Sequence, residues 1–428
     1  MPLSVLAHEC TCVTRFVCVA GHYLHANGEP AGAGASGGML GTSAILHRED
    51  GFSVLQVPED KVQMIGRAVN MRQALQRYLN VLALPDVRFV LGQTSYNNEF
   101  VLSMLREAAA MCSDDTPDRK TWQDMLRKSQ VLSLVTDITV KMKQRLSDKA
   151  VRELSAAELE VSGKVFDTAH EMLQAAIRGN GDNGSYLALK RAQGDDMSVM
   201  ELMQEQLLVR SCSTSAAATL LCMLRDNEKV VKNLEDTEKL FFLQHVTDNE
   251  RMKATFIRMA AALAAVRLGV GAGGDSRTKG IPENQSLVIE HWFKGRRDLL
   301  VRTQMSDRGG LEVVLPRVSK PVDLEALADP TNPYHHMLDY YEACLELYAA
   351  VCASQSTEGR NMVGGRHGGW MSYECLLSGQ TNNKLPVALR IRFVTTLGLC
   401  VDISCVRRGS GLRWQQVMSG MIATGLYG

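Results

Sequence analysis

Three basic residues, Lys120, Arg127 and Lys128, have the types and spacing suited to binding an anionic ligand such as a phosphate ester. A helix predicted to start near Thr121 would place Lys120 and Arg127 two turns apart on one side. Charge-assisted hydrogen bonds from such side chains to phosphate oxygens are strong. Asp124 lies between them and would partly cancel their positive field. An ordinary charged helix face explains the same residues equally well, so both interpretations stay open.

The remaining patterns that could do chemistry do not amount to a catalytic site. The glycine-rich residues 269–279 lack the Gly-Lys-Ser/Thr order of a phosphate-binding loop and follow a predicted helix, so a solvated loop is expected. His335 and His336 are adjacent and would point in different directions on a helix, as surface histidines. No Ser, Cys or His lies in a nucleophile-elbow pattern. We therefore predict no enzyme activity and no cofactor.

The 11 cysteines are odd in number and scattered, which favours reduced thiols in the cytosol. Cys10, Cys12, Cys18 and His22 form a metal-like cluster, but their spacing matches no standard zinc pattern. Buried cysteines in strands are the better explanation. The sequence therefore predicts no metal site.

The bulk composition argues against nucleic-acid and membrane partners. The 428 residues, enough for two or three domains, include 47 basic and 47 acidic residues, so net charge gives no reason to bind either. No apolar run approaches the roughly 18 residues of a membrane span, and the longest, residues 259–266, is alanine-rich. We expect a soluble chain without a membrane span.

The first 58 residues differ from everything after them. Short apolar or β-branched runs separated by Gly, Asn and Pro predict strands at residues 5–6, 13–19, 23–24, 44–46 and 52–57. Residues 28–41 are a glycine- and alanine-rich connector. These strands are too few for an independent β domain, so the sequence is expected to begin part-way through one.

From Pro58 and Glu59 onward the apolar residues recur at helical spacing. Helices are predicted at residues 61–84, 100–111, 122–142, 156–177, 197–209, 216–225, 237–246, 247–268, 285–293 and 297–304, and a Pro-broken segment at 313–327. A capping box at residues 247–250 opens the eighth of these helices. Many short helices with short links and no strands between them indicate stacked helical pairs, an armadillo-like solenoid.

Two further helices, at residues 334–353 and 385–402, have the clearest apolar stripes. In the second, Leu389, Phe393, Leu397 and Val401 recur every fourth residue, with residues 390, 392, 395 and 396 expected on the wet face. The first has a matching seam that includes Tyr341. Neither helix can bury its stripe alone, so each needs the other or a neighbour.

The order of these features resembles the N-terminal cytosolic region of inositol trisphosphate receptors and, more distantly, of ryanodine receptors. Five collinear segments carry the likeness: residues 52–61, 122–134, 216–234, 280–300 and 340–402, the last with Leu-Glu-Leu-Tyr-Ala-Ala-Val-Cys at 345–352. The resemblance implies a mainly α fold, with a partial β-trefoil (MIR-type) segment at residues 1–58. It also implies an armadillo-like ligand-core domain at residues 59–270 and a helical RIH-like domain at residues 271–428.

The family's ligand, inositol trisphosphate, binds between the trefoil and the first helical domain. By resemblance, Arg127 falls on a phosphate-binding arginine, Lys120 on another basic position, and Asp124 where the family has lysine. A basic-poor loop at residues 179–185 replaces the family's Tyr-Arg-Lys trio, with Lys190 and Arg191 farther along, and the arginine-rich trefoil loop would precede the sequence given. Each charge-assisted bond contributes on the order of 1.5–3 kcal/mol, so we expect weak or absent binding.

The resemblance implies a non-enzymatic regulatory and gating part of a calcium-release channel. Such a channel is a homotetramer, with this region on the cytosolic face of the endoplasmic reticulum membrane and the pore in a more C-terminal part. The alternative is a free-standing helical-repeat scaffold that binds a protein partner and has no pore. Transmembrane spans encoded downstream would discriminate the two.

Overall fold

The computed structural model describes residues 6–8, 15–17, 23–26, 40–43, 59–83, 95–147, 155–189, 198–209, 212–244, 254–267, 278–364 and 369–400. The chain divides into two compact units, Met1–Gly66 and Arg67–Gly428. The three predicted domains, residues 1–58, 59–270 and 271–428, remain a prediction. No helix in the described ranges combines the length and hydropathy that crossing a membrane requires.

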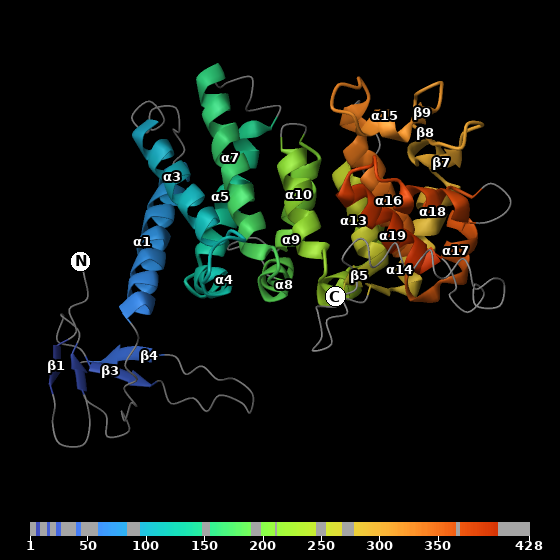
Figure 1. The fold of residues 1–428 in the computed structure, drawn as a ribbon. Coiled ribbons are helices and arrows are strands. Elements are labelled where there is room, and N and C mark those ends of the chain that lie inside the picture. Colours follow the sequence, from blue (N-terminus) through green and yellow to red (C-terminus); the bar gives the residue numbers. More distant parts are fainter. Residues whose placement is uncertain are drawn as a thin grey trace. The chain divides into compact units, whose positions relative to one another are not determined.

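The first unit contains a small antiparallel sheet in the order β1-β2-β3-β4 (Figure 1). Its strands are Leu6–His8, Arg15–Val17, Tyr23–Ala26 and Leu40–Ser43. Three of the predicted strand regions therefore contain strands, whereas those at residues 44–46 and 52–57 lie outside the described residues. So does the cluster of Cys10, Cys12, Cys18 and His22. Four short strands do not show a β-trefoil.

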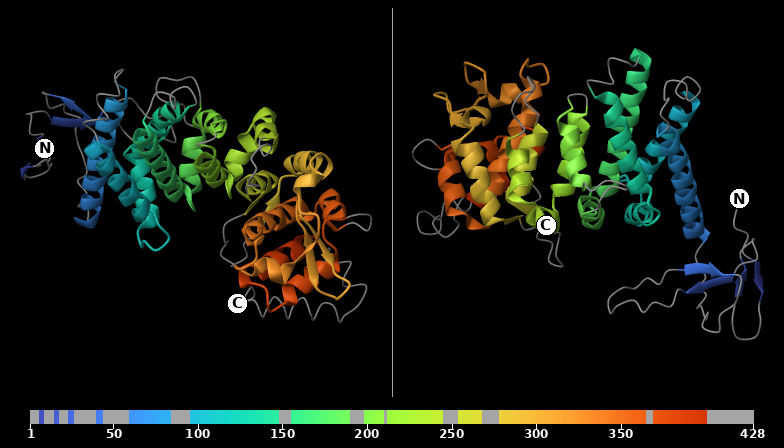
Figure 2. Two further views of the ribbon diagram at one scale, coloured as in Figure 1. Left: turned by 90° about the horizontal axis from the view of Figure 1, so that it is seen from above. Right: turned by 180° about the vertical axis from the view of Figure 1, so that it is seen from behind.

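A series of helices begins with α1, which runs from the last residues of the first unit into the second, and continues through the second unit, as the helical spacing predicted. They are α1 (Glu59–Leu82), α3 (Ser95–Met111), α4 (Arg119–Lys128), α5 (Val131–Leu146), α7 (Ala156–Ile177), α8 (Gly181–Leu189), α9 (Val199–Leu207), α10 (Ser213–Leu224), α11 (Glu228–Asn233), α12 (Asp236–Gln244) and α13 (Ala254–Ala264). The green α7 and the yellow-green α10 lie side by side from above and from behind (Figure 2). In turn α7 packs on α3 and α5, and α10 packs on α13.

Local signals explain where these helices begin. At the start of α7, the Ser155 hydroxyl accepts a hydrogen bond from the Glu158 N–H, and the Glu158 carboxylate accepts one from the Ser155 N–H. This reciprocal capping satisfies amide groups that a helix start leaves unpaired. A fully buried stripe that includes Val165, Phe166 and Leu173 then faces the neighbouring helices. The cap and the stripe together determine both the start and the orientation of α7.

The remainder of the second unit mixes helices with short strands. Its elements are β5 (Ala265–Arg267), β6 (Thr278–Gly280), α14 (Pro282–Val288), the π-helix η1 (Ile289–Lys294), η2 (Arg297–Leu299), β7 (Arg302–Met305), β8 (Leu311–Val314), β9 (Val322–Asp323), α15 (Leu324–Ala328), η3 (His335–Met337), α16 (Leu338–Cys352), η4 (Ala353–Gln355), α17 (Thr357–Gly364), α18 (Tyr373–Thr381) and α19 (Val387–Cys400). α13 packs on α16, and α16 packs on α19. The series of contacting helices thus continues to residue 400.

Several sequence predictions were wrong in this unit. Strands do occur among the helices: β5 pairs with β6, and β7, β8 and β9 form an antiparallel sheet where a helix at 297–304 and a Pro-broken segment were expected. The helix predicted at 122–142 is two helices, because Gln130 takes a left-handed φ of 65° between them. A helix, α8, begins at Gly181 where a loop was expected. The capping box at 247–250 lies outside the described residues.

The two helices with the clearest stripes do pack together. Leu389, Phe393 and Leu397 of α19 are buried, and the Phe393 ring lies 6.4 Å from the Tyr341 ring of α16. Thr396, expected on the solvent-exposed face, is also buried: it lies against α16, and its hydroxyl is satisfied by donating to the Arg392 carbonyl oxygen at 2.9 Å. Of the two alternatives left open, each other or a neighbour, the structure shows that α16 and α19 pack on each other, and one residue of the predicted polar face is buried with them. Val401, the last residue of the predicted stripe, lies outside the described residues.

Candidate functional site

The helix α4, which carries the predicted anion-binding residues, is fixed against the turn between α7 and α8. The Gln123 side chain donates to the Arg178 carbonyl oxygen at 3.0 Å, and the Asn183 side chain donates to the Gln123 carbonyl oxygen at 2.9 Å. Arg119 also donates to the Arg178 carbonyl oxygen. Residues 179–185, where the resemblance implies the family's Tyr-Arg-Lys trio, thus contact α4 through Asn183.

The three predicted basic residues all lie on α4 and differ in exposure. Arg127 is half-buried and its guanidinium lies 3.3 Å from the Asp124 carboxylate, which also accepts a hydrogen bond from Asn180 at 3.1 Å. Lys120 and Lys128 are exposed. The sequence correctly identified Asp124 as the opposing charge. Arg127 is already partnered by that carboxylate, and anion binding at these residues remains a prediction.

The two adjacent histidines have separate partners. The His335 Nδ1 atom donates to the Leu327 carbonyl oxygen at 3.1 Å, and the His336 Nδ1 atom donates to the Pro333 carbonyl oxygen at 3.0 Å. In the parts of the chain that the structure describes, no group of three or more His, Cys, Asp or Glu side chains could hold a metal ion. These histidines therefore act as local hydrogen-bond donors.

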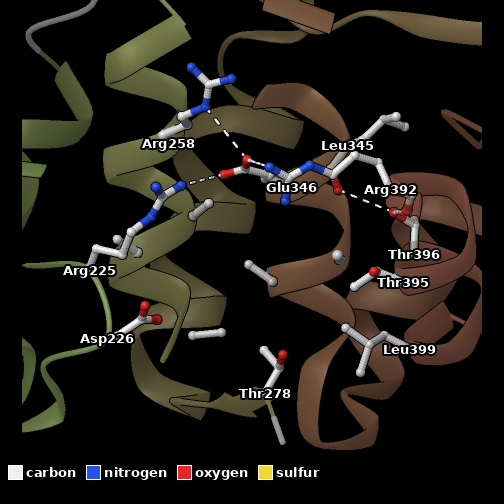
Figure 3. A pocket seen from close by; sticks show the side chains of 15 residues that line it. Arg225, Asp226, Arg258, Thr278, Leu345, Glu346, Arg392, Thr395, Thr396 and Leu399 are labelled. Atoms are coloured by element: carbon white, nitrogen blue, oxygen red, sulfur yellow. Dashed lines mark hydrogen bonds and ion pairs between the residues drawn. The ribbon is translucent and has the colours of Figure 1, made fainter. Parts of the chain in front are cut away.

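A different set of charged residues does converge, in a pocket between four helices (Figure 3). Glu346 of α16 is paired with Arg225 at the end of α10, with Arg258 of α13 and with Arg392 of α19. The distances from its carboxylate oxygens are 2.9 Å to Arg225, 3.6 Å to Arg258 and 2.6 Å to Arg392. We call these four residues the Glu346 cluster. Each guanidinium comes from a separate helix, so a single carboxylate joins α16 to three others.

Glu346 is the buried centre of this cluster, because its side chain is 7% exposed, against 43% for Arg225, 28% for Arg392 and 17% for Arg258. Arg258 is further fixed by the Asp339 carboxylate at 2.6 Å. Glu342 lies nearby, and burial raises the pKa of its carboxyl group. Between these charges the pocket is lined by alanine and threonine side chains, by Leu345 and Leu399, and by Asp226. The acidic neighbours offset the arginine charges.

The residues of the Glu346 cluster are better suited to holding helices in place than to catalysis. An arginine side chain stays protonated in proteins, so it does not serve as a general base or acid here. Three guanidinium groups on one buried carboxylate instead fix the spacing of the helices that carry them. The sequence analysis missed these residues. Glu346 interrupts the apolar run at 345–348, and this could have marked it as a buried charge. Its partner Arg225 is 121 positions away along the chain, so the sequence does not identify the pair.

A second buried polar network lies farther toward the N-terminus, at His170 of α7. Its Nδ1 atom lies 2.8 Å from the Thr219 hydroxyl of α10, and its Nε2 atom lies 3.0 Å from the Gln206 side-chain oxygen of α9. Because that amide oxygen can only accept, Nε2 carries the proton. Burial lowers the pKa of His170 to about 3. His170 is thus a neutral residue that connects three helices.

A groove between α8, α9, α11 and α12 is the third candidate. Its apolar lining includes Leu189, Val230 and Phe241, and Glu201, Glu235 and Glu238 contribute carboxylates. Burial raises the pKa of Glu238, and the charges of Glu235 and Glu201 raise it further. The Gln204 side-chain nitrogen is buried there without a hydrogen-bond partner. We call this the acidic groove; its charges favour a basic ligand.

Comparison with known families defines the class of the central helices. Residues 100–305 match the family model of the RIH domain, which belongs to the inositol trisphosphate and ryanodine receptor family. The match runs from within α3 to the last residue of β7. A search of curated proteins found no match to the chain. The resemblance to this receptor family is therefore supported over residues 100–305.

Proposed function

We propose that the chain is a non-catalytic regulatory and gating region of an inositol trisphosphate receptor-like calcium-release channel. In this proposal it lies on the cytosolic face of the endoplasmic reticulum membrane, within a homotetramer whose pore is elsewhere. The RIH-domain match over residues 100–305 supports the receptor class. The proposal includes a partial β-trefoil at residues 1–58 and armadillo-like stacking of the helices after it.

The observation that carries the gating part is the Glu346 cluster. Arg225 and Arg258 lie inside the matched residues 100–305, whereas Glu346 and Arg392 lie beyond them. A shift of α10 or α13 would have to break these ion pairs or move α16 and α19 with it. Packed helices with fixed contacts respond as units to a bias at one end. The cluster is thus suited to pass a displacement from the matched helices to those that follow.

We further propose that inositol trisphosphate binds the chain weakly or not at all. Asp124 occupies a position where the resemblance implies lysine, and it already pairs with Arg127. One decade of affinity corresponds to about 1.4 kcal/mol, so the loss of several charge-assisted contacts removes many decades. Isothermal titration with the purified chain tests this. Submicromolar binding that Arg127→Ala abolishes would contradict it.

The acidic groove favours the second candidate, a helical-repeat scaffold without a pore. Its carboxylates and apolar lining are complementary to a basic, apolar segment of a partner protein. Fluorescence anisotropy with a synthetic lysine- and leucine-rich amphipathic peptide tests this. We expect Glu238→Lys to weaken binding by at least about tenfold and Glu171→Lys, an exposed charge change on α7, to leave it unchanged.

The genomic sequence downstream separates the two candidates. Several transmembrane spans with a pore-like loop in the same reading frame would support the channel. An in-frame stop codon soon after residue 428 would support the scaffold and contradict the channel. This observation does not depend on any ligand, so it tests the class even if inositol trisphosphate does not bind.

A further inference from the structure

The C-terminal ends of α16 and α19 bring two cysteine sulfurs into contact. The Sγ atoms of Cys352, the last residue of α16, and Cys400, the last residue of α19, lie 3.1 Å apart. Both are free thiols. A disulfide has an S–S distance of about 2.05 Å, so closing the gap requires a movement of only about 1 Å. The pair is thus close to the geometry of a covalent bond.

Other contacts hold the two helices in a register that maintains this approach. The Arg392 guanidinium pairs with Glu346, and the Thr396 hydroxyl lies 3.3 Å from the Leu345 carbonyl oxygen. Phe393 lies against Tyr341 near the start of α16, and Cys400 contacts Cys352 at its end, so the two helices run in the same direction and end together. The sulfur contact therefore follows from the same interface that the two stripes form.

The two thiols differ in access. Cys352 is fully buried, whereas Cys400 is half-buried and faces partly toward solvent. Contact with the Cys400 thiol and burial raise the pKa of Cys352 well above its usual range, although the charge of Arg360 opposes this. The Arg360 side chain donates to the Leu399 carbonyl oxygen at 3.2 Å, next to Cys400. An oxidant from solution therefore reaches Cys400 first.

We propose that Cys352 and Cys400 form a reversible disulfide that covalently links α16 to α19 when the chain meets a disulfide oxidant such as glutathione disulfide. The Cys400 thiol loses its proton to water, and its thiolate attacks one glutathione sulfur and displaces one glutathione thiolate. The Cys352 thiolate, its proton also lost to water, then attacks the Cys400 sulfur and displaces the second glutathione. Two protein thiols are oxidised and one glutathione disulfide is reduced to two thiols.

Such a bond would fix the two helices at one end, while the Glu346 cluster holds them farther along. Disulfides in the cytosol are mostly transient and regulatory. This device does not depend on the channel proposal, because it requires only that α16 and α19 pack as they do. It would restrict any relative motion of the two helices for as long as the bond lasts.

Incubation of the purified chain with excess glutathione disulfide tests the proposal, followed by alkylation of free thiols and peptide mass spectrometry. We expect a peptide that links Cys352 to Cys400, the loss of two hydrogen masses, and a higher midpoint of thermal unfolding that dithiothreitol reverses. Cys400→Ser and Cys352→Ala should each remove the linked peptide and the shift. Cys222→Ser, which removes another half-buried thiol on α10, should keep both.

Three outcomes would overturn the proposal. The first is a stable glutathione adduct on Cys400 with Cys352 still free. The second is cross-linking of either cysteine to a different cysteine in equal or greater yield. The third is no change in either thiol under conditions that oxidise Cys222. Because Cys400 is half-buried, Cys400→Ser should fold even if the Cys352→Ala variant does not.

Discussion

The Glu346 cluster and the basic face of α4 both pair a carboxylate with arginine, but they differ in burial and in the distance they span along the chain. Asp124 and Arg127 are three residues apart on one helix and partly exposed. Glu346 is buried and its partners come from three other helices. A pair within one helix stabilises that helix slightly, whereas a pair between helices fixes their arrangement. The cluster, and not α4, therefore determines how neighbouring helices are spaced.

Glu346→Gln should have the largest effect. Removing the carboxylate leaves three guanidinium groups without their common partner, and breaking a buried ion pair costs about 3 kcal/mol. We expect the free energy of unfolding, measured by urea denaturation, to fall by about this amount. Glu290→Gln is the matched control, because Glu290 pairs with Lys294 on an exposed helix surface and should change stability by less than about 1 kcal/mol. Equal effects of the two variants would refute the comparison.

His170 should produce the next largest effect, through pH. Its pKa is about 3 in the folded chain and 6.5 in a model peptide, so the unfolded state binds the proton first as pH falls. Its contribution to stability is present above about pH 6.5, declines as pH falls toward about pH 3 and then levels off. Between about pH 7.5 and pH 5 the expected loss is about 2 kcal/mol.

Urea denaturation at several pH values measures this loss. His170→Gln should remove that part of the pH dependence, and His336→Gln, an exposed histidine, should retain it. An unchanged pH dependence in His170→Gln would show that other groups cause it.

Asp124→Lys tests whether the basic face of α4 can bind an anion. It removes the carboxylate that partners Arg127 and adds a cation beside Lys120. Inositol trisphosphate should then bind at least about tenfold more tightly than to the unaltered chain, because a charge-assisted contact contributes more than 1.4 kcal/mol. Isothermal titration measures the change, with Glu171→Lys as the control for net charge. No gain in Asp124→Lys would show that α4 is only a charged surface.

Arg225→Ala should have the smallest effect. The Arg225 side chain is 43% exposed, and Arg258 and Arg392 still contact Glu346 after its removal. We expect a loss below about 1 kcal/mol in urea denaturation. A loss as large as that of Glu346→Gln would mean that Arg225 alone, and not the set of three, neutralises the carboxylate.

The apolar stripes of the helices could be predicted from the sequence. The predictions were wrong where the local conformation depends on the backbone of a single residue or on pairing with a distant segment. The spacing of Leu389, Phe393 and Leu397 is a local property, and it predicted the helix and its need for a packing partner, which in the structure is α16. The break between α4 and α5 occurs because Gln130 adopts a left-handed backbone conformation. Glycine usually marks such positions in a sequence, and glutamine does not. The strands β7 and β8 are short, and their pairing depends on a turn with Gly309 at φ 78°.

The candidate site was harder to predict than the fold. The opposing charge of Asp124 beside the basic residues could be predicted from the sequence, because all of them lie on one helix. The Glu346 cluster could not be predicted, because its members are spread over residues 225–392. Taken singly, the arginines look like ordinary charged residues of a helix surface. Only the packing of α10, α13, α16 and α19 brings them together.

Hydrogen–deuterium exchange of Glu346→Gln tests the central claim, that this cluster couples the RIH-matched helices to those that follow. Exchange protection reports the local opening of each helix. We predict that α10, α13, α16 and α19 lose protection together, while α3 and α7 keep theirs. Loss of protection confined to α16 would contradict the claim, because it would show that the carboxylate stabilises its own helix without coupling the others.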